Sequence, residues 1–389
     1  MHKLKTISLL CGFILFTFSC EEKPEEVKIN DHTFLDALIE QGVDINADGI
    51  ISLAEAQTIS KLELNGKGII DMTGIEAFIN LDSLYCESNR FTWINLSECK
   101  KLRVLYCSHG RLRTLDVSKN PLLEALACER NVDLRQLDVS NHPHLVFLNC
   151  QYCGLTSLDI TGAVSLEILG SEMNRMTRID FSTNPKLRWL FFAFCDLESV
   201  DLSGLVELNW AYFQGNQLQT ATLGSHPELE NLALGMNHLT EIDLSGCTVL
   251  RILGLGLNEL TSLDVTYCLD LESLNFSSNH ISEIDLSDQL EIQTLRCNDN
   301  QLTSLNVSNM PDLIQLGCGL NQLSSLNLSN NSNLGMGLNE SYGCYLEIGY
   351  MPTLEEVCVW TEPFPPDGFL VCMDGSPNVY FSTNCINAK

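Results

Sequence analysis

Residues 250–270 read LRILGLGLNELTSLDVTYCLD, and this stretch decides the fold. Counting Leu250 as offset 0, leucines stand at offsets 3, 5, 10 and 13, and Asn258 stands at offset 8. The same frame starts at Leu81, Leu102, Leu123, Leu145, Leu166, Leu187, Leu208, Leu229, Leu271, Ile292 and Leu313, always 21 residues apart except for one step of 22. A regular period of this length predicts a solenoid in which each turn buries its apolar face against its neighbours.

The frame L-x-x-L-x-L-x-x-N/C-x-L resembles that of leucine-rich-repeat proteins. The resemblance implies a right-handed horseshoe or arc with a parallel β-sheet on its concave face. Offsets 3 and 5 should point into the core from this sheet, and offsets 13 and 15 should point inward from the outer wall. An asparagine at offset 8 should bond the backbone of the turn, which would otherwise lack partners. A repeat of 21 residues leaves no room for a long convex helix, so we expect extended or 3₁₀ segments there.

The repeat divides the chain into five segments. We expect a signal peptide at 1–19, a lipidated cysteine with an acidic tether at 20–30, and a helical N-terminal cap at 31–80. The repeats then occupy 81–333, in twelve copies. A degenerate repeat and a β-type C-terminal cap follow at 334–389, where residues 354–359 resemble a last strand and the tail a closing hairpin over the open edge.

Composition limits the class of partner. The 389 residues carry a formal charge of −28. Nucleic acid binding needs clustered Lys and Arg, so this balance excludes it and favours cationic partners.

The first residues predict export. Lys3 and Lys5 precede an apolar run at 7–18 that is too short to span a bilayer. The segment ends at Ser19-Cys20, which resembles a bacterial lipoprotein signal with lipid attached to Cys20. The alternative is ordinary secretory cleavage that leaves Cys20 free. Acidic residues directly after this cysteine resemble the surface-export signal of Bacteroidota lipoproteins, which implies the outer face of the outer membrane, with the lipid as the only membrane contact.

Residues 44–55 match the twelve-residue EF-hand calcium loop. Its expected ligands are the side-chain oxygens of Asp44, Asn46, Asp48, Ser52 and Glu55 together with the backbone carbonyl of Ile50. Gly49 stands where the loop turns sharply. Because the loop is solitary, we expect Ca²⁺ to be a structural cofactor of the cap. A calcium sensor or a docking surface is the alternative.

The cysteines follow the repeat. Six occupy inward offset 5: Cys86, Cys107, Cys128, Cys150, Cys297 and Cys318. Two occupy offset 8, Cys153 and Cys195, and three occupy offset 18, Cys99, Cys247 and Cys268. Their positions explain them as small buried fillers, so we expect reduced thiols. Cys358, Cys372 and Cys385 lie outside the ladder, with Cys344 just before them, and we expect one disulfide, formed by two of the last three.

One zone of the expected concave surface is aromatic. Offsets 1, 2, 4, 6 and 7 should face solvent there, and in three repeats they hold the residues that we call the concave aromatic patch: Phe147, Tyr152, Trp189, Phe191, Phe194, Trp210 and Tyr212. A contiguous exposed aromatic patch marks a binding surface more often than not. The alternative is that the rings stack on one another and only stiffen the sheet. A protein ligand suits so broad a patch better than a sugar does, although stacked rings also fit pyranose faces.

No catalytic motif is present: the sequence holds no H-E-x-x-H, no G-x-S-x-G and no phosphate-binding glycine loop. We therefore expect a protein that is not an enzyme. The whole layout, with residues 34–56 and the L-T-S-L-D-V repeats, resembles the leucine-rich-repeat surface lipoproteins of Bacteroidota, which are internalin-like binders. This resemblance implies surface recognition or adhesion through the concave face. The alternatives are a glycan-binding accessory of a polysaccharide uptake system and a purely structural envelope lipoprotein.

Overall fold

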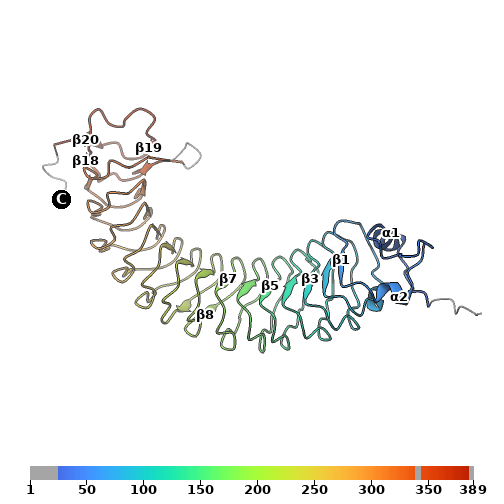
Figure 1. Cartoon of the computed structure of the whole chain (residues 1–389). Coiled ribbons are helices and arrows are strands. Elements are labelled where there is room, and N and C mark those ends of the chain that lie inside the picture. Colours follow the sequence, from blue (N-terminus) through green and yellow to red (C-terminus); the bar gives the residue numbers. More distant parts are fainter. Residues whose placement is uncertain (1–24, 338–342, 385–389) are drawn as a thin grey trace, which may run out of the picture.

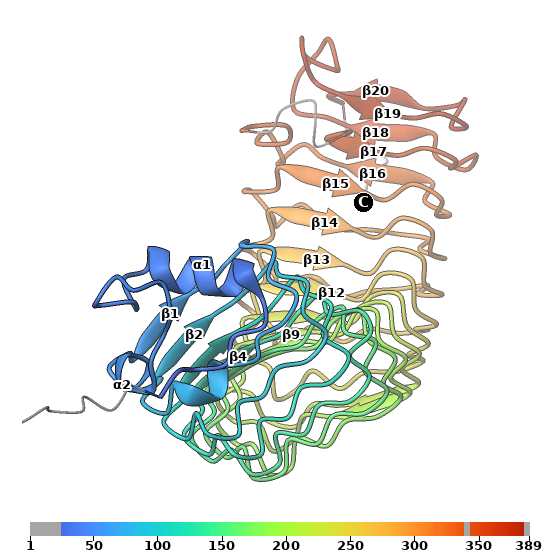
Figure 2. The ribbon, with the colours of Figure 1, turned by 90° about the vertical axis from the view of Figure 1, so that its right-hand side faces the viewer.

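The computed structural model describes residues 25–337 and 343–384, which form one curved solenoid (Figure 1). Its main sheet has fifteen parallel strands. In spatial order they are β1 (Lys61–Glu63), β2 (Ser83–Tyr85), β3 (Val104–Tyr106), β4 (Ala125–Ala127), β5 (Phe147–Asn149), β6 (Ile168–Gly170), β7 (Trp189–Phe191), β9 (Trp210–Tyr212), β11 (Asn231–Ala233), β12 (Ile252–Gly254), β13 (Ser273–Asn275), β14 (Thr294–Arg296), β15 (Gln315–Gly317), β17 (Leu346–Glu347) and β19 (Val371–Cys372). Figure 2 looks onto the inner side of the arc, where strands β12 to β15 lie one above another. The predicted leucine-rich-repeat fold is confirmed.

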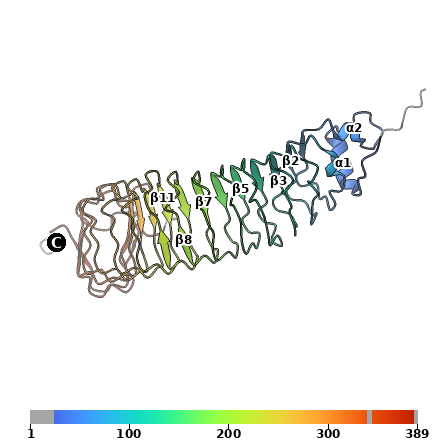
Figure 3. The ribbon, with the colours of Figure 1, turned by 90° about the horizontal axis from the view of Figure 1, so that it is seen from below.

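Strand register follows the repeat frame. Leu253, at offset 3, pairs with Leu232 on one side and Leu274 on the other. All three side chains are buried in the core. The single 22-residue step keeps this register, because Leu126 still pairs with Leu148 across it. Figure 3 shows the turns following one another from the helical end to the C-terminal end.

The asparagine at offset 8 ties each turn to the one before it. Asn258 donates from Nδ2 to the carbonyls of Leu255 (2.9 Å) and Leu234 (3.0 Å), and its Oδ1 accepts the N–H of Leu239 at 3.0 Å. Leu234 and Leu239 belong to the preceding turn, so one side chain satisfies backbone groups of two turns. Asn174 and Asn300 bond in the same way. The predicted role of this position is confirmed.

The outer wall consists of turns and short extended segments, as expected. It forms two small parallel sheets: β8 (Ser199–Asp201) with β10 (Thr220–Thr222), and β16 (Ser325–Asn327), β18 (Glu356–Cys358) and β20 (Tyr380–Ser382). An aspartate recurs at offset 14 of most turns, and its Oδ1 accepts the N–H two residues later at 2.9 Å, as in Asp243, Asp264 and Asp285. This short-range bond shapes the turn at the outer wall.

The N-terminal cap contains α1 (His32–Glu40), α2 (Leu53–Ala56) and the 3₁₀ turn η1 (Ile75–Ala77). Phe34 and Leu38 of α1 are fully buried and close the apolar core at this end of the solenoid. Asp31 caps α1 by accepting the N–H of Thr33, and its other oxygen accepts the N–H of Ile70 at 2.7 Å. Among the described residues, no helix is long and apolar enough to cross a membrane.

The C-terminal cap differs from the prediction. The expected last strand at 354–359 contains β18, which lies in the outer wall and not in the main sheet. As far as residue 384, where the described part of the chain ends, the tail forms no hairpin, because β19 joins the main sheet and β20 joins the outer wall, both in parallel pairs. The solenoid instead continues for two turns with longer spacing: Leu316 pairs with Leu346 and Leu346 with Val371. The changed spacing hides these turns from a 21-residue frame.

Removing the offset-8 amide should destabilise the solenoid. Asn258→Ala leaves the N–H of Leu239 without a partner and removes one of two donors from the carbonyls of Leu234 and Leu255, which keep Asn237 and Asn279. We therefore expect a loss of roughly 1–3 kcal/mol in the free energy of unfolding. Urea unfolding followed by circular dichroism measures it. Asn258→Cys is the matched comparison, because Cys153 and Cys195 occupy this offset and donate from sulfur to a carbonyl of the preceding turn at 3.2 Å. A loss no larger in the alanine variant than in the cysteine variant would contradict this role.

The aspartates of the outer wall should make stability pH-dependent. Hydrogen bonds from the side chain and the backbone of Thr266 lower the pKa of Asp264, and the corresponding bonds lower the pKa of Asp243 and Asp285. A pKa lower in the folded than in the unfolded state stabilises the protein above the unfolded value, near 4, and the contribution is lost as the pH falls through the folded value. The melting temperature should therefore fall steeply on acidification.

The control is the triple variant Asp243→Asn/Asp264→Asn/Asp285→Asn. Asn306 and Asn327 already fill this offset and accept the same N–H at 3.1 and 3.0 Å, so the turn is retained. We expect a shallower fall of the melting temperature between pH 6 and pH 3 than in the wild type. Parallel curves for the two proteins would contradict the assignment.

Candidate functional site

The strands bring the concave aromatic patch together in rows. Phe147, Ile168, Trp189 and Trp210 occupy offset 2 and are paired strand to strand in that order. At offset 4, Phe191 pairs with Tyr212. The two tryptophans therefore lie on adjacent strands, one strand spacing of about 4.8 Å apart along the sheet.

The rings of the patch are only partly exposed. Trp210 is 39% exposed and Phe194 is 41% exposed, whereas Trp189, Phe191 and Tyr212 are half-buried. Phe191 and Tyr212 stack with their ring centres 5.5 Å apart and 9° between their planes. Trp210 meets Tyr212 edge to face at 6.0 Å. Ring packing within the sheet thus coexists with two exposed rings, Trp210 at offset 2 and Phe194 at offset 7.

Two arginines cover rings at the N-terminal side of the patch. The guanidinium of Arg188 lies 5.2 Å from the centre of the Trp189 ring, and that of Arg130 lies 4.6 Å from the centre of the Tyr152 ring. These cation–π contacts shield one face of each ring. The freest aromatic surface therefore lies at Trp210 and Phe194.

The aromatic row extends further than the sequence analysis indicated. Tyr85 and Tyr106, at offset 4 of β2 and β3, contact each other at 5.3 Å, and Tyr106 lies 6.4 Å from Phe147. Burial raises the pKa of Tyr106. Their shared offset with Phe191 was the signal that could have found them.

The position of the Phe194 ring requires a glycine in the next turn. Offset 7 takes a left-handed backbone in almost every repeat, with φ of 53° at Tyr152 and 54° at Phe194. At Gly215, which fills this offset after Phe194, a Cβ atom would lie 2.4 Å from the Phe194 ring. The absence of a side chain at Gly215 therefore lets the Phe194 ring lie across the next turn.

A pocket follows the aromatic strands. Its volume is about 380 Å³, and it is lined by Gln214, Ala233, Gly235, Met236, Gly254, Gly256, Leu257, Asn275, Ser277 and Ser278. It arises because offsets 4 and 6 hold large or polar side chains in β9 and its turn but only alanine or glycine in the next two turns. The sequence analysis missed it, although the run of glycines was its signal. A larger hollow of about 710 Å³ lies on the outer wall and is lined mainly by polar and charged side chains, away from the patch.

The predicted calcium loop is closed by its own hydrogen bonds. Asp44 Oδ2 accepts the N–H of Gly49 at 2.9 Å, Asn46 Oδ1 accepts that of Asp48 at 2.9 Å, and Asp48 Oδ1 accepts that of Ile50 at 3.0 Å. These bonds hold three side-chain oxygens on one loop, where the donor set suits a hard cation.

Glu55 is engaged with the same loop. Its carboxylate accepts the N–H of Ile45 at 2.9 Å and both the N–H and the hydroxyl of Ser52 at 2.9 and 2.8 Å. The N–H of Ser52 is the largest contribution that lowers the pKa of Glu55. Within residues 25–337 and 343–384, no group of three or more His, Cys, Asp or Glu side chains is arranged to hold a metal ion. Glu55 would have to exchange its hydrogen bonds to become a ligand, and calcium binding stays a prediction.

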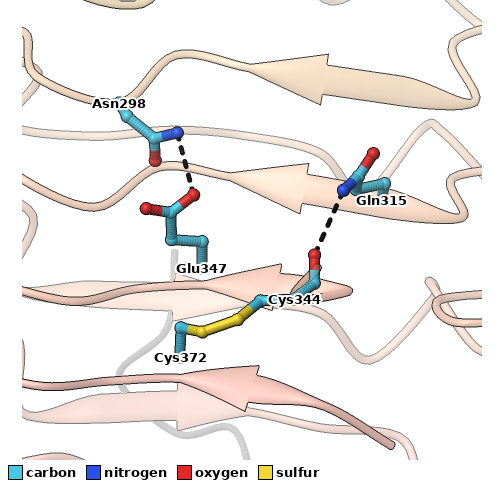
Figure 4. Close-up of a disulfide and its surroundings, with 5 residues drawn as sticks. All are labelled: Asn298, Gln315, Cys344, Glu347 and Cys372. Atoms are coloured by element: carbon cyan, nitrogen blue, oxygen red, sulfur yellow. Dashed lines mark hydrogen bonds between the residues drawn. A yellow bond between two sulfur atoms is a disulfide. The ribbon is translucent and has the colours of Figure 1, made fainter. Parts of the chain in front are cut away.

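One disulfide joins cysteines of neighbouring turns of the main sheet. Cys372 bonds Cys344, with a Cα–Cα distance of 5.8 Å (Figure 4). β17 and β19 are neighbours and bring Cys344 beside Cys372, a pair that the sequence did not indicate. The expected disulfide between two of the last three cysteines stays a prediction. Cys358 is also disulfide-bonded, and Cys385 lies outside the described residues.

The bonded pair is tied to the preceding turns. Gln315 donates to the Cys344 carbonyl at 3.1 Å, and Asn298 donates to Glu347 at 3.2 Å (Figure 4). The disulfide therefore links the last turns of the main sheet to a hydrogen-bonded part of the inner face.

The ladder cysteines are buried free thiols, as predicted. Burial raises the pKa of Cys99 and Cys247 to about 12, so their thiolate forms are strongly disfavoured. The lipidation site predicted at Cys20, together with the signal peptide, lies outside the described residues.

The comparisons with known proteins agree with the fold. No model of a known protein family matches the sequence, and no curated protein matches it. The register, the offset-8 ladder and the inner sheet define a leucine-rich-repeat fold.

Among solved structures, the chain is similar to the functional domain of InlJ from Listeria monocytogenes, which includes a cysteine ladder. The two share 28% identity with a TM-score of 0.66, over 80% of this chain and 70% of that one. The leucine-rich-repeat protein LIC12759 of Leptospira interrogans has 19% identity and a TM-score of 0.60, over 85% of this chain and 93% of that one. The ectodomain of the plant receptor kinase GASSHO1/SCHENGEN3 from Arabidopsis thaliana, solved in complex with CASPARIAN STRIP INTEGRITY FACTOR 2, has 20% identity and a TM-score of 0.53, over 74% of this chain and 40% of that one.

Proposed function

We propose that this chain is a non-enzymatic recognition protein that binds a protein ligand through the concave aromatic patch. The observation that carries the proposal is the pair of exposed rings, Trp210 and Phe194, on the inner face of an open, curved sheet. Large aromatic side chains give much contact area at a low entropy cost and are frequent hot spots of protein interfaces. The GASSHO1/SCHENGEN3 ectodomain is an example of the same fold with a bound partner.

Ring packing favours a protein over a glycan. A pyranose stacks on a free ring face, but Phe191 and Tyr212 each use one face against the other, and Arg188 covers part of Trp189. The surface that is left consists of ring edges and the exposed parts of Trp210 and Phe194. Such a surface fits between the side chains of a folded partner. Contacts between the rings are also what a purely structural role would need, so the structural envelope protein is the second candidate.

The proposed setting is the cell surface, with an adhesive role towards a host or neighbouring cell. The lipoprotein signal ending at Cys20 and the acidic residues after it support anchoring at the outer face of an outer membrane. The charge of −28 supports a partner with a basic surface.

The double variant Trp189→Ala/Trp210→Ala tests the proposal. The chain from residue 21 onward is screened against immobilised extracellular-matrix proteins and glycans. We expect a protein hit whose affinity falls at least about tenfold in the double variant. The matched control is Trp93→Ala, because Trp93 is 51% exposed but lies on the outer wall, and this variant should bind as the wild type does.

Each other outcome has a definite meaning. A glycan hit that is lost in the double variant favours the polysaccharide accessory. A hit kept by the double variant moves the site away from the patch. No hit, together with a lower melting temperature of the double variant, favours the structural role.

We also propose that Ca²⁺ binds the loop between α1 and α2 and stiffens the N-terminal cap. The residues that would hold it are Asp44, Asn46, Asp48, Ile50, Ser52 and Glu55. Their oxygens are the ligands that this hard cation prefers, and an ion bound only to the folded cap stabilises it by mass action.

Millimolar Ca²⁺ should raise the melting temperature of EDTA-treated protein by several degrees, and Glu55→Gln should remove most of that rise. Asp36→Asn, in an exposed position on α1 outside the loop, is the control and should keep it. Equal melting temperatures of the wild type in Ca²⁺ and in EDTA would contradict the proposal.

A further inference from the structure

The pocket beside the aromatic patch lies where the side chains of the inner face change from large to small. At offset 4 the sheet passes from Phe191 and Tyr212 to Ala233 and Gly254. Exposed apolar side chains border the step, with Met236 at 47% and Leu257 at 55% exposure. The result is the hollow of about 380 Å³ directly beyond the Tyr212 ring.

The floor of the pocket has room for a side chain. A Cβ atom on Gly254 would have its nearest neighbour, the Cα of Ala233, at 3.8 Å, which is ordinary contact. At Gly235, by contrast, a Cβ would come within 2.9 Å of the Gly256 carbonyl oxygen. Space is therefore open above Gly254, where the same offset carries aromatic rings in β7 and β9.

Two buried acceptors near the pocket lack donors. The side-chain oxygens of Gln214 and Asn231 are fully buried and have no hydrogen-bond partner. Asn231 as a whole is only 7% exposed, and its strand neighbours at that offset are Trp210 and Ile252. An unpaired buried acceptor costs stability. Gln214 lines the pocket, so a rotation of its side chain that brought the oxygen to an N–H of a ligand would be favourable.

An unpaired carboxylate lies on the other side of the patch. Glu172 follows β6, is half-buried and takes part in no ion pair or side-chain hydrogen bond with any described residue. Burial raises the pKa of Glu172. Its distance from the pocket is three to four strand spacings, or about 15–20 Å, which four to six residues of an extended chain span.

We propose that this pocket holds a large apolar side chain of an extended peptide segment of the partner, and that Glu172 pairs with a Lys or Arg four to six residues away in that segment. The inference rests on the proposed function and adds the chemistry of the ligand. An apolar hollow with the Gln214 amide in its lining fits a side chain flanked by main-chain N–H groups. The free carboxylate supplies the charge complementarity.

A library of random dodecapeptides displayed on phage, selected on the chain from residue 21 onward, is the test. The selected peptides should share Leu, Met or Phe with a Lys or Arg at the stated spacing. Synthetic copies should bind Gly254→Leu at least about tenfold more weakly, because the new side chain fills the pocket. Glu172→Gln should weaken them severalfold, and that loss should vanish in about 0.5 M salt, which screens the ion pair.

Controls separate the pocket from a general loss of structure. Thr294→Leu adds the same side chain to the inner face at β14 and should bind as the wild type does. Met236→Ser removes one wall without adding bulk, in an offset where Ser278 already stands, and it replaces Gly254→Leu if that variant fails to fold. Folding is checked by circular dichroism and melting temperature.

Peptides without the apolar preference, peptides that bind both pocket variants as tightly as the wild type, or no selected peptide at all would overturn the inference. None of these results bears on the proposed function. That proposal is tested separately, by whether the Trp189→Ala/Trp210→Ala variant loses binding to a folded protein ligand.

Discussion

Every turn of this solenoid leaves backbone N–H and C=O groups inside the molecule, where water cannot reach them. The offset-8 amide meets this demand with three hydrogen bonds, and two of them cross to the preceding turn. Because the bonds cross between turns, they fix the position of each turn relative to the one before it. The strands of the inner sheet are therefore in register, and the apolar core is continuous from α1 to the last turns.

The inner surface follows from that register. Side chains at one offset form a row across the sheet, so the character of the surface at any point depends on two or three adjacent repeats. Phe191 and Tyr212 stack because they share offset 4 on neighbouring strands, and the pocket opens where that row passes to Ala233 and Gly254. The stacked rings and the hollow beside them are thus consecutive parts of one row.

The periodic parts of this molecule could be predicted from the sequence because one frame governs them. Leu253 in the core, the offset-8 amide and the adjacency of Trp189 and Trp210 all follow from counting in steps of 21. Departures from the period could not be predicted. The turns of β17 and β19 continue the main sheet at longer spacing, so their sequence suggested a hairpin and did not indicate the Cys344–Cys372 disulfide.

Other features of the site depend on three-dimensional contacts that an offset does not encode. The repeat frame predicts that a ring faces the concave side, but how far the Phe191 ring is buried depends on its stacking against Tyr212. The pocket lies where alanine and glycine take the place of larger side chains, so looking for aromatic residues in the sequence does not reveal it. The loop predicted to bind calcium lies between α1 and α2, whereas the engagement of Glu55 with Ile45 and Ser52 depends on how the loop closes.

The 22-residue repeat shows where this fold accommodates an inserted residue. Its extra residue falls between Asn131 and Leu134, after the strand, and Leu126 still pairs with Leu148. Strand spacing in the inner sheet is nearly constant, so the bulk of the outer wall sets how far each turn is rotated from the last. The outer wall therefore controls the radius of the concave face. Residues that no ligand touches can widen or narrow the opening, and with it the size of the partner that fits.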